Sequence, residues 1–126
     1  MEVAVNNVIR IPTSQKKFFR FWFEFLKPFH KLTDREIDVI TAFTYERYNL
    51  GKVISDEAIL DKVVMSEDTK KKIREEYKVT PAYFQVIMGK LRRNGLIVNN
   101  KINPRFIPNI TEDNGSFKLM LLFEIQ

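Results

Sequence analysis

The chain has 126 residues, a length that suits one domain and leaves little room for two independent cores. Its 21 basic and 16 acidic residues give a formal charge of +5, and its 44% apolar and 29% charged content excludes a disordered or low-complexity chain. It has no cysteine and one histidine, His30, which excludes thiolate metal sites, cysteine nucleophiles and nearly every histidine-dependent catalytic site. We therefore expect a protein that is not an enzyme and holds neither a metal nor a cofactor.

The hydropathy pattern gives no sign of a membrane protein. No segment reaches the roughly 18 uninterrupted apolar residues that a membrane-spanning helix needs. Residues 1–7 lack the basic start and the long apolar run of a signal peptide. We expect a cytoplasmic protein with no membrane partner.

The basic surplus is concentrated in the middle of the chain. Residues 66–108 hold ten basic and four acidic side chains, a net charge of +6. Residues 1–65 hold ten basic and nine acidic side chains, and residues 109–126 hold one basic and three acidic side chains. The central stretch is therefore where an anionic partner is expected to bind.

The N-terminal part is rich in aromatic residues. Residues 2–11 alternate in part and stop at Pro12, which predicts a short strand. From Ser14 onward, polar residues recur every three or four positions, which predicts a helix buried on most sides. A competing interpretation is a strand, because phenylalanines alternate at positions 19, 21, 23 and 25. Pro28 is expected to end the helix or to kink it.

This aromatic helix is expected either to complete the core or to form the seam of a homodimer or of a contact with a protein partner. An interfacial membrane helix is the weaker interpretation, because the helix lacks a broad basic face. The expected partner surface consists of Phe18, Phe19, Trp22, Phe23 and Phe25.

Three helices are expected between residues 33 and 77. Thr33 and Glu36 form a capping box in which Thr33 caps the amide of Glu36 and the Glu36 carboxylate returns to the Thr33 amide. Gly51 is expected to end this helix in a left-handed conformation. Asp56 and Ser66 are expected to cap the next two helices.

A further helix is expected directly after a short turn. Thr80 is expected to cap it, and Pro81 suits its first position. The apolar spacing places Phe84, Ile87, Met88 and Leu91 on the inner face. On or near the outer face we expect Ala82, Tyr83, Gln85, Val86, Gly89, Lys90 and Arg93.

After Gly95 the pattern becomes strand-like. Residues 96–98, 102–110 and 117–125 are read as strands, with a turn signal at residues 113–115. Together they predict a β-ribbon that closes the domain. The expected fold class is mainly α with a small β-ribbon (α+β).

Residues 69–97 resemble the helix-turn-helix of winged-helix DNA-binding proteins and the start of the wing. The similarity rests on the cap at Thr80, the inward Phe84, Leu91, and the exit through Gly95, Leu96 and Ile97. It implies a winged helix-turn-helix domain over residues 32–126 and an N-terminal extension, a strand and the aromatic helix, over residues 1–31, within one compact unit. The stretch between Gly51 and Ser66 is longer than the family pattern.

A weaker similarity is that Ile102, Asn103 and Pro104 resemble a motif of some plasmid or phage replication initiators.

The resemblance implies that the helix at residues 81–94 lies in the major groove of double-stranded DNA. Base contacts would come from Ala82, Tyr83, Gln85 and Val86, and Gln85 can pair bidentately with adenine. Gly89 would allow close approach. Phosphate contacts would come from Lys70, Lys71, Lys72, Lys78, Thr80, Lys90, Arg92, Arg93, Lys101 and Arg105.

Two functions are expected from these observations. The preferred one is a non-catalytic double-stranded DNA-binding protein, a transcription regulator or a replication factor of a phage or mobile element. The alternative is a protein–protein interaction or structural module of a phage or multi-protein complex built on the same scaffold, since Val86 and Gly89 lie on the outer face. A lysine run can also be no more than a solvated helix face, and Arg92 and Arg93 can serve only the helix dipole.

Overall fold

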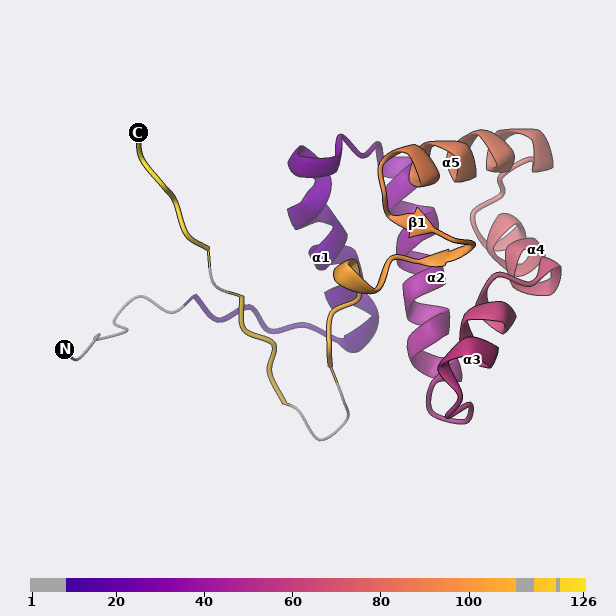
Figure 1. The fold of residues 1–126 in the computed structure, drawn as a ribbon, viewed down its shortest axis with the longest axis horizontal. Helices are drawn as coiled ribbons and strands as arrows, with labels where there is room; N and C mark the ends of the chain where they lie inside the picture. The colour runs from indigo at the N-terminus through magenta and orange to yellow at the C-terminus, as the bar shows by residue number, and fades with distance from the viewer. Residues whose placement is uncertain (1–8, 111–114, 120) are drawn as a thin grey trace.

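The computed structural model describes residues 9–110, 115–119 and 121–126 of the chain (Figure 1). Within these ranges the fold is mainly helical with one small antiparallel sheet, as expected. The elements in chain order are α1 (Gln15–His30), α2 (Asp34–Leu50), α3 (Glu57–Val64), α4 (Glu67–Glu76), α5 (Pro81–Arg93), β1 (Ile97–Val98), β2 (Lys101–Ile102) and the 3-10 turn η1 (Pro104–Phe106).

Each α-helix begins where the sequence offers a capping side chain. Every cap accepts a hydrogen bond from the backbone amide three residues later, which satisfies one of the free amides of the first turn. The expected helix starts are thereby confirmed. The capping residues are Ser14, Thr33, Asp56, Ser66 and Thr80.

The core forms around α2, which packs against α1, α3, α4 and α5. Figure 1 shows α2 in the middle, with α1 on one side, α3 and α4 on the other, and α5 across one end. Phe43 of α2 and Phe84 of α5 are fully buried, with ring centroids 6.3 Å apart. The position of α5 is therefore fixed by apolar packing against the central helix.

The aromatic segment is helical, so the strand interpretation of residues 19–25 is wrong. Phe19, Phe23 and Leu26 are buried, and Phe23 and Leu26 belong to the same core as α2 and α5. The expectation that Pro28 ends the helix is also wrong, because α1 continues to His30. Pro28 lies exposed in the last turn, and the amides of Lys31 and Leu32 close the helix end on the carbonyl of Lys27.

The expected N-terminal strand falls mostly on residues 1–8, which lie outside the described residues. Its last residues, 9–11, are described and are not in a strand.

Gly51 does not have the expected left-handed conformation, since its φ is −63°. The chain continues from α2 into a turn in which the amides of Val53 and Ile54 both bond to the carbonyl of Leu50. This turn satisfies the helix end without a left-handed residue.

The hairpin is much shorter than the expected ribbon. Ile97 pairs with Ile102 and Val98 with Lys101, and Asn99 and Asn100 form the turn with φ of 53° and 57°. The expected strand over residues 102–110 is wrong, because Pro104 begins η1 and the Asn103 side chain caps it.

The expected strand over residues 117–125 does not form in the described residues 115–119 and 121–126. The first two residues of the expected turn at 113–115 lie outside the described part of the chain.

Candidate nucleic-acid interface

The connection between α4 and α5 is a tight turn made by residues 77–80. Lys78 has a left-handed backbone with φ of 53°, and the Val79 amide bonds to the Arg74 carbonyl at 2.9 Å. Val79 is buried, and Arg35 of α2 donates to the Tyr77 carbonyl at 3.2 Å. These contacts hold α4 and α5 in one relative orientation.

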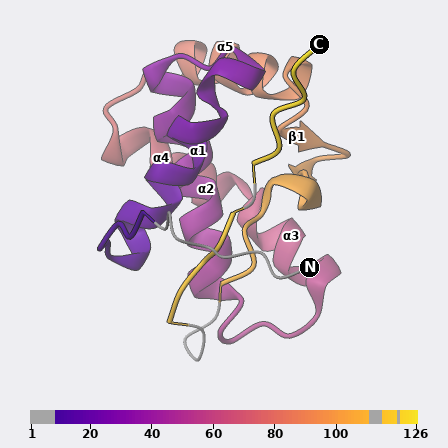
Figure 2. The same cartoon turned by 90° about the vertical axis from the view of Figure 1, so that its left-hand side faces the viewer.

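The two faces of α5 separate as the apolar spacing predicts. Phe84, Ile87, Met88 and Leu91 are all buried. On the opposite face the side chains of Tyr83 and Val86 are 46% and 49% exposed. Ala82 and Gln85 are exposed beside them. Figures 1 and 2 both show α5 along one edge of the molecule, so the predicted base-contact residues lie on an outer surface.

A shallow basic hollow of about 370 Å³ lies where α4 meets the start of α5. Its lining contains three cations and one carboxylate, so it is net positive. The Arg74 guanidinium lies 5.5 Å from the centre of the Phe84 ring, which orients it at the edge of the core. The residues of this basic hollow are Lys71, Arg74, Glu75, Lys78, Val79 and Pro81.

Arg74 is a functional candidate that sequence reasoning missed. Lys71 and Arg74 have the i, i+3 spacing of one helix face, and Lys78 follows in the turn after α4. This spacing is the signal that could have identified Arg74. The predicted phosphate contacts were instead the consecutive lysines 70–72, whose side chains lie on different faces of α4.

The other two lysines of that run point elsewhere. The Lys70 side chain is only 13% exposed, and its ammonium lies 3.7 Å from the Glu67 carboxylate. The Lys72 ammonium donates to Glu46 of α2 at 2.6 Å, and this hydrogen bond raises the pKa of Lys72. Of the three lysines at residues 70–72, only Lys71 lines the basic hollow.

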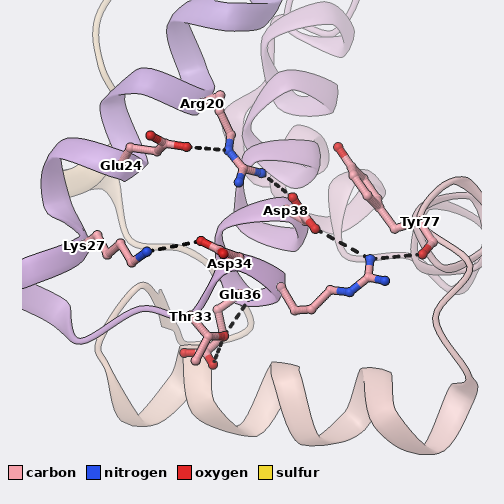
Figure 3. A network of polar contacts seen from close by, with 9 residues as sticks. Arg20, Glu24, Lys27, Thr33, Asp34, Glu36, Asp38 and Tyr77 are labelled. Carbon is pink, nitrogen blue, oxygen red and sulfur yellow. Dashed lines mark hydrogen bonds and ion pairs between the residues drawn. The ribbon is translucent and has the colours of Figure 1, made fainter.

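Lys90 lies beside a buried carboxylate. Glu36, at the start of α2, is 2% exposed, and its carboxylate lies 3.8 Å from the Lys90 ammonium. It also accepts from the Thr33 hydroxyl at 2.5 Å (Figure 3) and from the Asn94 side-chain amide at 3.4 Å. Instead of returning to the Thr33 amide as expected, the Glu36 carboxylate ties the start of α2 to the end of α5.

The remaining predicted phosphate contacts lie around α5 and the hairpin. Arg92 and Arg93 are exposed at the C-terminal end of α5, roughly 18 Å from its first residue at 1.5 Å per residue. Thr80 is exposed, and its hydroxyl caps the Tyr83 amide. Lys101 is half-buried on β2, and the exposed Arg105 has its guanidinium 5.9 Å from the centre of the Phe106 ring.

The predicted partner surface on α1 is largely used by the chain itself. Phe19 and Phe23 are buried, and Phe18, Trp22 and Phe25 are half-buried. The Trp22 indole donates to the Phe106 carbonyl at 2.7 Å, which fastens η1 to α1. Of the two roles expected for the aromatic helix, completion of the core is the one that this packing fulfils.

The cations between α1 and α2 are paired with acids (Figure 3). Arg20 binds Glu24 and Asp38, and Lys27 lies 3.1 Å from Asp34. Burial alone would lower the pKa of Arg20, but its hydrogen bonds to Asp38 and Glu24 raise it. This part of the molecule therefore offers less uncompensated positive charge than the turn before α5.

The described residues contain no group of three or more His, Cys, Asp or Glu side chains placed to hold a metal ion. None of the helices in the same residues has the length and hydropathy needed to cross a membrane. Comparison with protein-family models, with curated proteins and with solved structures gave no match.

Proposed function

We propose that this protein binds double-stranded DNA without catalysis and that α5 enters the major groove. The observation that carries the proposal is the outer face of α5, which is exposed and has basic side chains at both ends. Lys71, Arg74 and Lys78 lie at its start, and Arg92 and Arg93 lie at its end. Cations at both ends of an exposed helix can contact the phosphate backbones that border a groove.

The order α4, turn, α5 and hairpin supports a winged helix-turn-helix arrangement, with α1 as an addition to it. An α-helix with its side chains fits the roughly 12 Å width of the major groove. In this arrangement Ala82, Tyr83, Gln85 and Val86 face the bases, and the basic hollow faces a phosphate. From the resemblance of residues 69–97 to winged-helix DNA-binding proteins, we propose a role in transcription or in the replication of a phage or mobile element.

The alternative function, a protein-interaction module, has one observation in its favour. Tyr83 and Val86 are both about half exposed and lie one turn apart on α5. Such a pair suits a protein contact as well as contact with thymine methyl groups. The charge at both ends of α5 favours DNA.

The experiment that tests the proposal is selection of bound duplexes from a random pool, followed by measurement of affinity against salt. We expect a recurrent sequence motif and an affinity that falls steeply with salt, because phosphate contacts release counterions. Failure of the folded protein to retain any duplex at low salt would contradict the proposal. Binding without a motif would contradict base reading by α5.

A further inference from the structure

The C-terminal residues 117–119 and 121–125 lie outside any helix or strand and carry apolar side chains in solvent. Leu119 and Leu121 are about half exposed, and Phe123 and Ile125 are 81% and 95% exposed. Figure 1 shows the end of the chain standing apart from the helices. These side chains are thus left uncovered by the part of the chain that the structure describes.

Between its two charged residues this segment is wholly apolar, because residues 119–123 are Leu, Met, Leu, Leu and Phe. In a strand, Phe117, Leu119, Leu121, Phe123 and Ile125 would form one face, and the opposite face would hold Lys118, Met120, Leu122 and Glu124. No strand pairs with it among the described residues. An exposed apolar segment of this kind is a template for pairing with another strand.

The two charges of the segment are placed symmetrically, which suits pairing with a second copy of the same segment. Lys118 and Glu124 each lie three positions from Leu121, on opposite sides of it. If two copies pair antiparallel about Leu121, each Lys118 lies opposite the Glu124 of the second copy. In the same register Leu119 lies opposite Phe123, and Phe117 lies opposite Ile125.

Other registers lose this match. Parallel pairing in register would place Lys118 opposite Lys118 and Glu124 opposite Glu124, and directly opposed like charges are destabilising. A slip by one residue would set charged side chains opposite apolar ones. We propose that residues 117–125 pair antiparallel with the same segment of a second copy of this chain, with the twofold axis at Leu121.

A paired ribbon of two strands needs a surface to cover its apolar side chains, because an isolated ribbon is marginal in water. The structure already has the start of one. The Phe117 ring lies 5.1 Å from Phe18 and 5.6 Å from Trp22, centre to centre. From Trp22 the contacts continue along α1 to Phe25 at 6.2 Å and from there to the exposed Phe29 at 5.7 Å. This aromatic row, Phe117, Trp22, Phe25 and Phe29, lies at the root of the ribbon.

Pairing of the two segments does not depend on DNA binding, and it is tested by measuring the dimerisation of the protein without DNA. Pairing of one segment with itself gives an isologous dimer, which is the commonest symmetry of soluble oligomers. If the proposed function also holds, the same dimer would present two copies of α5 to a DNA site with twofold symmetry.

The experiment is a charge swap measured by sedimentation equilibrium of the full chain at micromolar concentrations. The variants are Lys118→Glu, Glu124→Lys and the double variant. Each single variant sets like charges opposite each other at two places per dimer, so we expect dimerisation to weaken on the order of tenfold. The double variant restores opposite charges and should dimerise as the wild type does.

Circular dichroism controls for folding. The spectra of the variants should match that of the wild type, because the side chains of Lys118 and Glu124 are exposed. A wild-type chain that remains monomeric would overturn the proposal. So would a dimer whose association is unchanged in both single variants, or a double variant that associates no better than the single ones. A Leu121→Lys variant checks the axis, since it would place two lysines face to face and should yield monomers.

Discussion

At the scale of single residues, Lys78 combines an unfavourable backbone with a well-placed charge. Its φ of 53° lies in the left-handed region, which costs a non-glycine residue about 1–2 kcal/mol. Helix ends commonly place glycine at such a position. A lysine there costs stability but adds a cation to the basic hollow.

The substitution Lys78→Gly should therefore separate stability from binding. We expect the free energy of unfolding to rise by about 0.5–1 kcal/mol, because glycine accepts a positive φ without strain. DNA affinity should fall, because one phosphate contact is lost. Urea unfolding and fluorescence anisotropy measure the two effects. Lys78→Ala is the matched control, since it removes the same charge without the gain in stability, and equal DNA affinity in all three proteins would rule out this contact.

Glu36 is the second residue whose role is specific to the fold. Its buried carboxylate joins Thr33, Lys90 and Asn94 across two helices. We expect Glu36→Ala to lower the free energy of unfolding by about 1–3 kcal/mol, because the buried partners lose their acceptor. Urea unfolding checks this value.

Glu24→Ala is the control, because Glu24 is a more exposed carboxylate paired with Arg20. Its loss should change the free energy of unfolding by no more than about 0.5 kcal/mol. If the two variants unfolded alike, the Glu36 contacts would not stabilise the junction of α2 and α5.

At the scale of elements, the sequence predicted what depends on local signals. The helix starts follow from capping side chains, and the faces of α5 follow from apolar spacing. The predictions that were wrong concern features that depend on contacts with distant residues or on how a turn closes. Pro28 lies inside α1, Gly51 ends α2 without a left-handed φ, and Glu36 turns toward α5. The apolar run over residues 102–110 looked like a strand, but η1 interrupts it and its Phe106 carbonyl binds Trp22 of α1.

Within α5, Gly89 gives a test of the helix itself. A Cβ atom added there meets no heavy atom within 4 Å. We expect Gly89→Ala to raise the free energy of unfolding by about 0.5–1 kcal/mol, because alanine loses less backbone entropy than glycine in a helix. Urea unfolding measures it, and a loss of stability would mean that α5 is packed more closely at this position than the structure has it.

At the scale of the whole molecule, the proposed DNA binding depends more on where the positive charge lies than on the net charge of the chain. The net +5 of the chain is moderate, and the cations between α1 and α2 are paired with acids. The cations of the basic hollow lie beside the exposed outer face of α5. The sequence shows a basic stretch over residues 66–108. It could not show that residues 70–72 divide between two faces of α4, because that division depends on where α2 lies.

The most direct test of DNA binding through α5 uses that division. Lys71→Ala and Lys72→Ala remove the same charge from neighbouring positions, but Lys71 lines the basic hollow and Lys72 binds Glu46. Anisotropy titrations with a selected duplex over a range of salt concentrations compare the two. We predict that Lys71→Ala weakens binding several-fold and lowers the slope of log affinity against log salt by about 0.9, whereas Lys72→Ala leaves the slope unchanged. Equal effects of the two variants, or no effect of Lys71→Ala, would contradict the proposed interface.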